Sequence, residues 1–214
     1  MSIFKKGDFN NDEDFNFTAV KMFGQNAKIS YVNYGSQEVL ISSPTLKAPF
    51  GLSKFTGTDS VKYSLDLSFG DLSYDKNKEF YETIEYLEKI VKNYVKNNSK
   101  KFLNKDTITD EVLESLFTSN IKSSNPNYPP NFRLKVPYYN GTFQVSVFDE
   151  NRLKVDNVDT AIERNTNMKC VVKFAGVWVA GGKFGISWKL EQIKLSKTHE
   201  IKKVLNSFAF CDDD

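Results

Sequence analysis

Histidine and cysteine are scarce in this chain of 214 residues. Hydrolase triads and zinc-activated water generally need histidine, and the single His199 lies in a lysine-rich segment where we expect a surface position. Cys170 and Cys211 have no metal-ligand partner at a useful spacing, so we expect reduced, structural thiols. The sequence therefore predicts a protein that is not an enzyme and that holds no metal or cofactor.

Long apolar runs are also missing. No run approaches the length of about 18 residues that a membrane-spanning helix needs, and the opening MSIFKKGDFNNDEDF contains no apolar segment typical of a secretory signal. We therefore expect an intracellular protein that is neither secreted nor inserted in a membrane. Arginine is rare too, so lysine supplies nearly all of the positive charge.

The net charge of +2 conceals an uneven distribution along the chain. Residues 1–14 carry a net −2 and Asp212–Asp214 add −3, which leaves +7 on residues 15–211. A basic body with acidic ends is typical of a protein that binds a polyanion and whose own tail competes for the site. Lysines that only solvate the surface, in a chain from a low-GC genome, would give the same count.

Hydrophobic periodicity predicts a mainly β protein interrupted by helices. Val61–Phe69 alternates with a period of two, which is typical of a half-buried strand. Residues 75–97 instead carry apolar side chains at helical spacing, and Thr109 precedes a shorter helix over 110–117. Further strands are expected at 15–22, 27–34, 38–42, 132–136, 142–148, 152–155, 168–174, 177–180 and 183–195, with a short helix or linker at 199–206.

This order of elements favours an α+β chain, mainly β, built as an OB-like five-stranded Greek-key barrel with extra strands. We expect Gly176 and Gly181-Gly182 to supply the bulges or turns of a bent sheet. The expected organisation is a flexible acidic arm over 1–14, a single OB-like domain over 15–206 with a helical insertion at about 75–131, and an acidic tail over 207–214.

The segment from Lys169 to Leu195 combines both tryptophans of the chain with several lysines. Aromatic rings stack on bases and amines neutralise phosphates, so this combination is typical of a surface that binds single-stranded nucleic acid. The alternating apolar face of the last strand is either core or an aromatic platform. The candidate binding residues here are Lys169, Lys173, Trp178, Lys183, Phe184, Trp188 and Lys189.

Two smaller groups add to this candidate. One joins cations to a turn that carries two tyrosines, and its rings either clamp a base or close the end of the barrel; its residues are Arg133, Lys135, Tyr138 and Tyr139. The other is an aromatic, acidic tail that either covers the binding groove and docks on partner enzymes or only solvates the terminus; its residues are Phe208, Phe210, Asp212, Asp213 and Asp214.

The block CVVKFAGVWVAGGKFGISWKLEQIKL, residues 170–195, resembles the C-terminal block of the single-stranded DNA-binding proteins of large nucleocytoplasmic DNA viruses. That family is distantly similar to the OB-fold replication proteins of short-tailed phages. A weaker resemblance covers the strands from Ala27 to Phe69 and the segment FRLKVPYYNG. The resemblance implies an OB-fold, cooperative or homodimeric binding of single strands, and a place at a viral replication fork. The phage tails tend to end in an aromatic residue, whereas this chain ends in Asp214.

We therefore expect a non-enzymatic, sequence-nonspecific binder of single-stranded DNA in viral replication, recombination or repair. Its partners would be single-stranded DNA, replication enzymes docked on the acidic tail, and a second copy of the chain, in the host cytoplasm (a viral factory) or the nucleus. One alternative is a virion or structural β-sandwich protein with both tryptophans in its core. A second is an RNA-binding or transcription-associated factor. The sequence leaves open the oligomeric state, the site size and which face of the last strand is buried.

Overall fold

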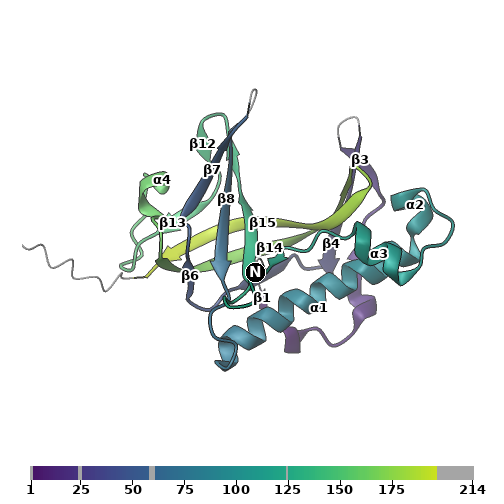
Figure 1. Cartoon of the computed structure of the whole chain (residues 1–214), viewed down its shortest axis with the longest axis horizontal. Helices are drawn as coiled ribbons and strands as arrows, with labels where there is room; N and C mark the ends of the chain where they lie inside the picture. Colours follow the sequence, from purple (N-terminus) through teal and green to yellow (C-terminus); the bar gives the residue numbers. More distant parts are fainter. Residues whose placement is uncertain (1, 24–25, 58–60, 124, 197–214) are drawn as a thin grey trace, which may run out of the picture.

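The computed structural model describes residues 2–23, 26–57, 61–123 and 125–196. Thirteen of the strands form one strongly bent sheet, and the longest helix lies against one side of it (Figure 1). The strands are β1 (Ile3–Phe4), β2 (Phe15–Phe17), β3 (Lys21–Phe23), β4 (Ala27–Tyr34), β5 (Val39–Ser42), β6 (Leu46–Ala48), β7 (Leu52–Thr56), β8 (Val61–Ser68), β9 (Ile121–Lys122), β10 (Asn131–Val136), β11 (Tyr138–Tyr139), β12 (Thr142–Phe143), β13 (Ser146–Phe148), β14 (Thr166–Ala180) and β15 (Lys183–Leu195). The α-helices are α1 (Asp75–Asn97), α2 (Ser99–Leu103), α3 (Asp110–Leu116) and α4 (Val158–Ala161).

The long strand β14 organises the sheet. One of its edges pairs with β15 along nearly the whole strand. Its other edge pairs in succession with β6, β5 and β4. From β6 the sheet continues through β8 to β7 and β10. Two upright arms result, one with β7, β8 and β12 and the other with β3 and β4, joined below by β14 and β15 (Figure 1).

β14 bends where its register with β15 shifts, between Phe174 and Gly176. Gly176 has a φ of 144°, a conformation that side chains with a Cβ rarely adopt. A Cβ at this position would lie 1.9 Å from the carbonyl oxygen of Ser30, so a larger residue would push β4 away. The prediction of a glycine bulge at Gly176 is confirmed, and this bulge lets one strand carry both arms.

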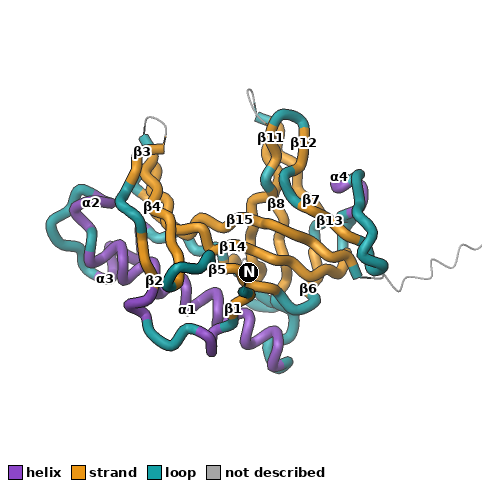
Figure 2. The backbone as a smooth tube through the Cα atoms, turned by 180° about the vertical axis from the view of Figure 1, so that it is seen from behind, coloured by secondary structure: helices purple, strands orange, loops and turns teal. Residues whose placement is uncertain are grey.

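The helix α1 covers the sheet below the two arms (Figure 2). Its apolar side chains at helical spacing are buried, among them Phe80, Ile84, Leu87 and Val91, as an amphipathic helix requires. Its opposite face is charged. In the ranges that the structure describes, no helix is both long and apolar enough to cross a bilayer.

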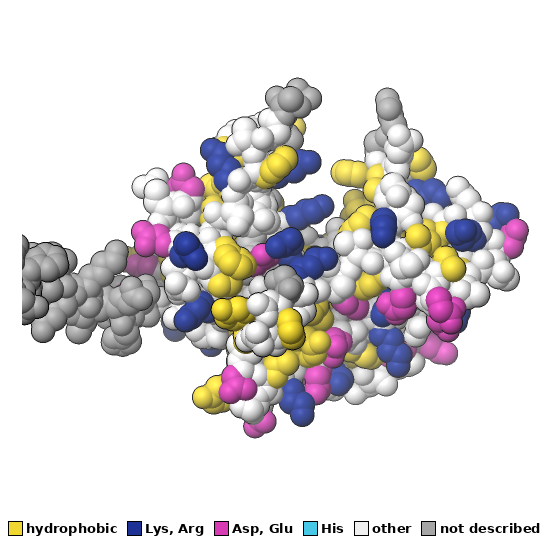
Figure 3. Space-filling view, in the orientation of Figure 1, with side chains coloured by type: hydrophobic (Ala, Val, Ile, Leu, Met, Phe, Trp, Pro, Cys, Tyr) yellow, Lys and Arg dark blue, Asp and Glu magenta, His cyan; other side chains and the backbone are white. Residues whose placement is uncertain are grey.

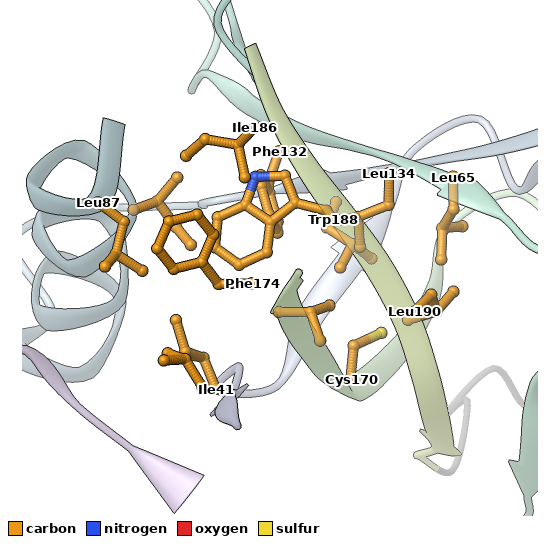
Figure 4. Packing of buried hydrophobic residues seen from close by; sticks show 14 of the residues in the cluster. Ile41, Leu65, Leu87, Phe132, Leu134, Cys170, Phe174, Ile186, Trp188 and Leu190 are labelled. Carbon is orange, nitrogen blue, oxygen red and sulfur yellow. The ribbon is translucent and has the colours of Figure 1, made fainter. Parts of the chain in front are cut away.

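The main core lies between α1 and the inner face of the sheet (Figure 4). Trp188 meets Phe132 edge-on, with ring centroids 5.3 Å apart, and lies 5.7 Å from Phe174. Trp188 is 8% exposed and Phe184 is fully buried. The alternating apolar face of β15 is therefore core. Among the described residues the buried indole nitrogen of Trp188 has no hydrogen-bond partner.

The first residues pack against this body through two aromatic side chains, whereas the sequence predicted a flexible arm over 1–14. β1 pairs in parallel with β5, and Phe4 is buried and stacks on Phe9 at a centroid distance of 5.5 Å. Lys6 contacts Glu82 of α1 at 3.1 Å. Phe4 and Phe9 anchor this segment by burying apolar surface. The sequence prediction missed them because it relied on the polar average composition of the segment.

Locally patterned elements match their predictions. β4, α1 and β15 have the predicted bounds. α3 begins after Thr109, whose hydroxyl accepts a hydrogen bond from the Val112 N–H at 3.4 Å. The strands expected at 168–174 and 177–180 are one continuous strand, and 152–155 forms only an isolated bridge to Phe148. The segments 199–206 and 207–214 lie outside the described residues.

Candidate nucleic-acid interface

A groove of about 610 Å³ lies between the two arms. In the space-filling view the surface is hollowed there, and lysine and arginine side chains gather in the hollow (Figure 3). The cations that line the groove are Lys62, Lys122, Arg133 and Lys135. The aromatic residues that line it are Phe55, Tyr63, Tyr138, Trp178 and Trp188.

One wall of the groove is the outward face of β7, β8 and β10. Residues directly opposite each other in antiparallel strands share a face, and so do alternate residues along a strand. The cross-strand rows on this wall are Phe55–Lys62, Ser53–Ser64–Lys135 and Asp66–Arg133. Phe55 is 66% exposed, so this wall offers an open ring directly beside a lysine.

The other wall is built from β14 and β15, and their sheet face continues onto β4 and β3. Trp178 and Ser187 line the groove from this side. The rows on the same face are Tyr31–Gly176–Ser187, Lys21–Ile29–Trp178–Gly185 and Phe23–Ala27–Ala180–Lys183. Phe23 and Tyr31 are exposed, so aromatic surface continues up this arm beyond the groove.

Trp178 is half-buried and held in place by its neighbours. Its indole N–H donates to the carbonyl of Ile186 at 3.0 Å. Its ring lies against Gly185, where a Cβ would come within 3.0 Å of the ring and 2.7 Å of the Thr118 carbonyl oxygen. Gly185 thus makes room for the ring, and the indole keeps a fixed orientation at the groove.

The charges of the groove are almost entirely positive. No carboxylate is among the lining residues, and Lys62, Lys122 and Lys135 form no ion pair within the described part of the chain. Among the described residues, Arg133 alone of the four binds a carboxylate, that of Asp66, which lies beside it on β8 with a side chain 8% exposed. Three lysines are therefore free to neutralise an anion.

A buried carboxylate positions the loop that closes one end of the groove. Glu88 of α1 accepts hydrogen bonds from the Ser119 hydroxyl at 2.8 Å and from the Asn120 N–H at 2.9 Å. Asn120 in turn exchanges hydrogen bonds with the main chain of Arg133. Burial raises the pKa of Glu88, and its bonds to Ser119 and Asn120 partly oppose that shift. The helical insertion thereby holds one border of the groove.

The structure brings together some of the residues predicted from the sequence. Trp178, Arg133, Lys135 and Tyr138 line one groove, although they come from two separate predicted groups. Trp188 also borders the groove but is 8% exposed, and Phe184 is fully buried. The expected aromatic platform of β15 therefore faces the core, because the alternating side chains of that strand fill the space above α1.

Other predicted residues lie away from the groove. Lys173 and Lys189 face each other across β14 and β15 and pair with Glu38 and Glu191, respectively. Lys183 donates to the carbonyl of Ser115 at 2.9 Å. Lys169 borders a separate pocket beside α1, and Tyr139 is exposed on the short β11–β12 hairpin. The tail residues lie outside the described ranges.

Several residues of the groove were not predicted from the sequence. Phe55 lies on β7 and Lys122 on the short strand β9, and neither segment was predicted as a strand. Lys62 was visible as an outward position in the alternation of Val61–Phe69.

The described residues contain no cluster of three or more histidine, cysteine or acidic side chains that could hold a metal. Burial raises the pKa of the Cys170 thiol to about 12.

Residues 64–212 match a family of unknown function, DUF5871. The chain belongs to this family. An uncharacterized protein of Acanthamoeba polyphaga mimivirus is 22% identical over 191 residues, which cover 83% of this chain. The matched part is 30% of that relative, so the chain spans about a third of its length.

Solved structures of phage proteins are similar in fold. A C-terminally truncated single-stranded DNA-binding protein of bacteriophage Enc34 gives a TM-score of 0.52 at 12% identity, over 86% of this chain and 97% of that one. A single-stranded DNA-binding protein encoded by bacteriophage T7 gives a TM-score of 0.48 at 11% identity, over 79% of this chain and 98% of that one. The prediction of a mainly β, OB-like fold is confirmed.

Proposed function

We propose that the groove binds single-stranded DNA without reading its sequence and without catalysis. The observation that carries this proposal is the lining of the groove, which among the described residues has four cations, no carboxylate, and aromatic side chains on both walls. Lysines and Arg133 neutralise phosphates, while Trp178 and Phe55 offer ring faces to bases. This combination binds single strands because their bases are unstacked and reachable.

The fold supports the same proposal. The Enc34 protein with a TM-score of 0.52 is a single-stranded DNA-binding protein, and the relative that is 22% identical is a protein of a virus, Acanthamoeba polyphaga mimivirus. A role in viral DNA replication, recombination or repair is part of the proposal. Binding of replication enzymes by the acidic tail and pairing with a second copy remain proposals as well.

The test is a titration of the full chain with oligo-dT at several salt concentrations, in which tryptophan fluorescence reports binding. We expect quenching from Trp178, and an affinity whose logarithm falls with log salt by about 0.7 for each phosphate neutralised. Four groove cations then predict a slope of roughly −3. A Trp178→Phe variant should lose most of the quenching and keep most of the salt dependence.

The same titration separates the alternatives. No binding at low salt contradicts the proposal and leaves the structural β-protein hypothesis. Oligo-U of the same length tests the RNA hypothesis, because a site built for RNA gains affinity from the 2′-hydroxyl. Equal or tighter binding of oligo-dT favours DNA.

A further inference from the structure

Arg133 is held more firmly than the other cations of the groove. Its Nε and Nη2 donate to the two carboxylate oxygens of Asp66 at 2.7 and 2.6 Å. Its backbone N–H donates to the Asn120 carbonyl and its carbonyl accepts from Asn120 Nδ2, both at 2.8 Å. Both the main chain and the side chain of Arg133 therefore have a set orientation before any ligand arrives.

The contact with Asp66 leaves one edge of the guanidinium free. Arg133 lines the groove and its side chain is 53% exposed, whereas Asp66 lies beside it on β8 with a side chain 8% exposed. The carboxylate uses Nε–H and one N–H of Nη2, so the N–H groups of Nη1 and the second N–H of Nη2 remain. Two such parallel N–H groups match two oxygens of a phosphate.

Stability does not explain this pair. Burying a carboxylate costs desolvation energy, and apolar residues of similar volume are often as stable in place of a buried ion pair. The hydrogen bonds that Arg133 donates to Asp66 raise the pKa of Arg133, but arginine is charged at neutral pH without such help. What the pair does provide is a fixed orientation of the guanidinium.

We propose that Asp66 is a positioning residue for nucleic-acid binding, which aims the free Nη edge of Arg133 at one phosphodiester of the bound strand. This inference rests on the proposed function of the groove. A phosphodiester fits better than a base edge because Lys135 follows two residues later on the same strand face. Arg133 and Lys135 then contact neighbouring phosphates of the bound nucleic-acid strand.

The variant Asp66→Asn tests the proposal because two explanations predict opposite signs. If only charge matters, removing a negative charge beside the groove strengthens binding to oligo-dT. If Asp66 positions Arg133, binding weakens by about tenfold, the effect of losing a charge-assisted hydrogen bond. The salt slope should also become shallower by about 0.7. Tighter binding by Asp66→Asn would overturn the proposal.

The matched control is Asp106→Asn, the same substitution at a carboxylate that contacts Lys100 at 2.7 Å on the helical side of the molecule. It should leave the affinity unchanged or slightly higher. Arg133→Gln and the double variant with Asp66→Asn complete a cycle. If Asp66 acts through Arg133, its substitution has no further effect once Arg133 is glutamine.

Arg133→Lys keeps the charge and removes the planar fork, so it should bind nearly as weakly as Arg133→Gln. Wild-type affinity in Arg133→Lys overturns the proposal. If thermal unfolding shows that Asp66→Asn does not fold, Arg133→Lys alone still tests the proposal. A loss seen with guanine-containing oligonucleotides but not with oligo-dT would assign Arg133 to a base and also overturn it. If wild-type protein binds no oligo-dT, the proposed function itself fails.

Discussion

The groove and the helical layer are both rich in lysine, but among the described residues only the lysines of the helical layer have carboxylate partners. On the helical side Lys92 contacts Glu114 at 2.6 Å and Lys96 contacts Asp110 at 2.7 Å. Lysines of the groove, such as Lys62 and Lys135, have no such partner in the described ranges. Lysine alone does not mark a binding surface, because a neighbouring carboxylate already neutralises much of its charge.

This difference bears on the two explanations of the basic composition. A lysine-rich surface that serves only solubility would carry interspersed charges of both signs, as the helical layer does. The groove instead concentrates one sign on the wall formed by β8, β10 and β9, which raises the local potential and attracts a polyanion. The predictions that follow alter this contrast, and they run from the largest expected effect on binding to the smallest.

The triple substitution of Lys62, Lys122 and Lys135 by glutamine should abolish most of the binding. Removing three phosphate contacts lowers the affinity by about a hundredfold at 0.1 M salt and makes the salt slope shallower by about 2. The measurement is a fluorescence titration with oligo-dT at four salt concentrations.

The control for this triple is the same change at three paired lysines, Lys78, Lys96 and Lys100. It removes an equal charge from the helical side. Comparable losses in both triples would mean that net charge alone governs binding, and the groove would lose its special role.

Trp178→Ala should weaken binding by about 1–3 kcal/mol, the usual contribution of one stacked base. The ring is half-buried at the groove, so stability should fall less than in Trp188→Ala. That second variant empties a core position and should destabilise the fold by about 3–5 kcal/mol. Oligo-dT binding and thermal unfolding of both variants measure the contrast; unchanged affinity in a folded Trp178→Ala would remove stacking from the proposal.

Glu88 links the helical layer to the groove, and its titration affects stability. Because the pKa of Glu88 is raised in the folded protein, its protonated form contributes stability. This contribution is complete below about pH 4.5 and is lost as the pH rises through the pKa of the folded protein. Glu88→Gln does not titrate, so its stability relative to wild type should improve between pH 4 and pH 8. Thermal unfolding across that range is the measurement, and parallel curves would contradict the shift.

The smallest effect should come from releasing lysines that are now paired. Glu38→Gln and Glu191→Gln free Lys173 and Lys189, which lie on the same sheet face as Trp178 but beyond the groove. Affinity for oligo-dT should rise by only a fewfold, since exposed ion pairs are weak and the phosphates there are distant. A gain of a hundredfold would instead extend the binding surface along β14 and β15.

How much the sequence predicted depends on whether the signal was local. β4, α1 and β15 have their predicted bounds because alternation or helical spacing is visible within each segment. The inward face of β15 was not predictable, because alternation defines two faces without saying which one α1 covers. Likewise, the pairing of Lys96 with Asp110, and the absence of a partner for Lys62 within the described ranges, depend on chain segments that meet only in the folded protein.

The continuous run of β14 and β15 has a mechanical consequence. β6 pairs with one end of β14 and β4 with the other, so the two walls stand on a single hydrogen-bonded ribbon without an intervening hinge loop. Its curvature, set at Gly176, presets the aperture. A polymer entering that aperture meets walls that need not close around it, and little conformational entropy is lost on binding. We therefore expect the fixed width of the groove to select its ligand before any side-chain contact does. It admits an unpaired nucleic-acid strand and excludes a duplex.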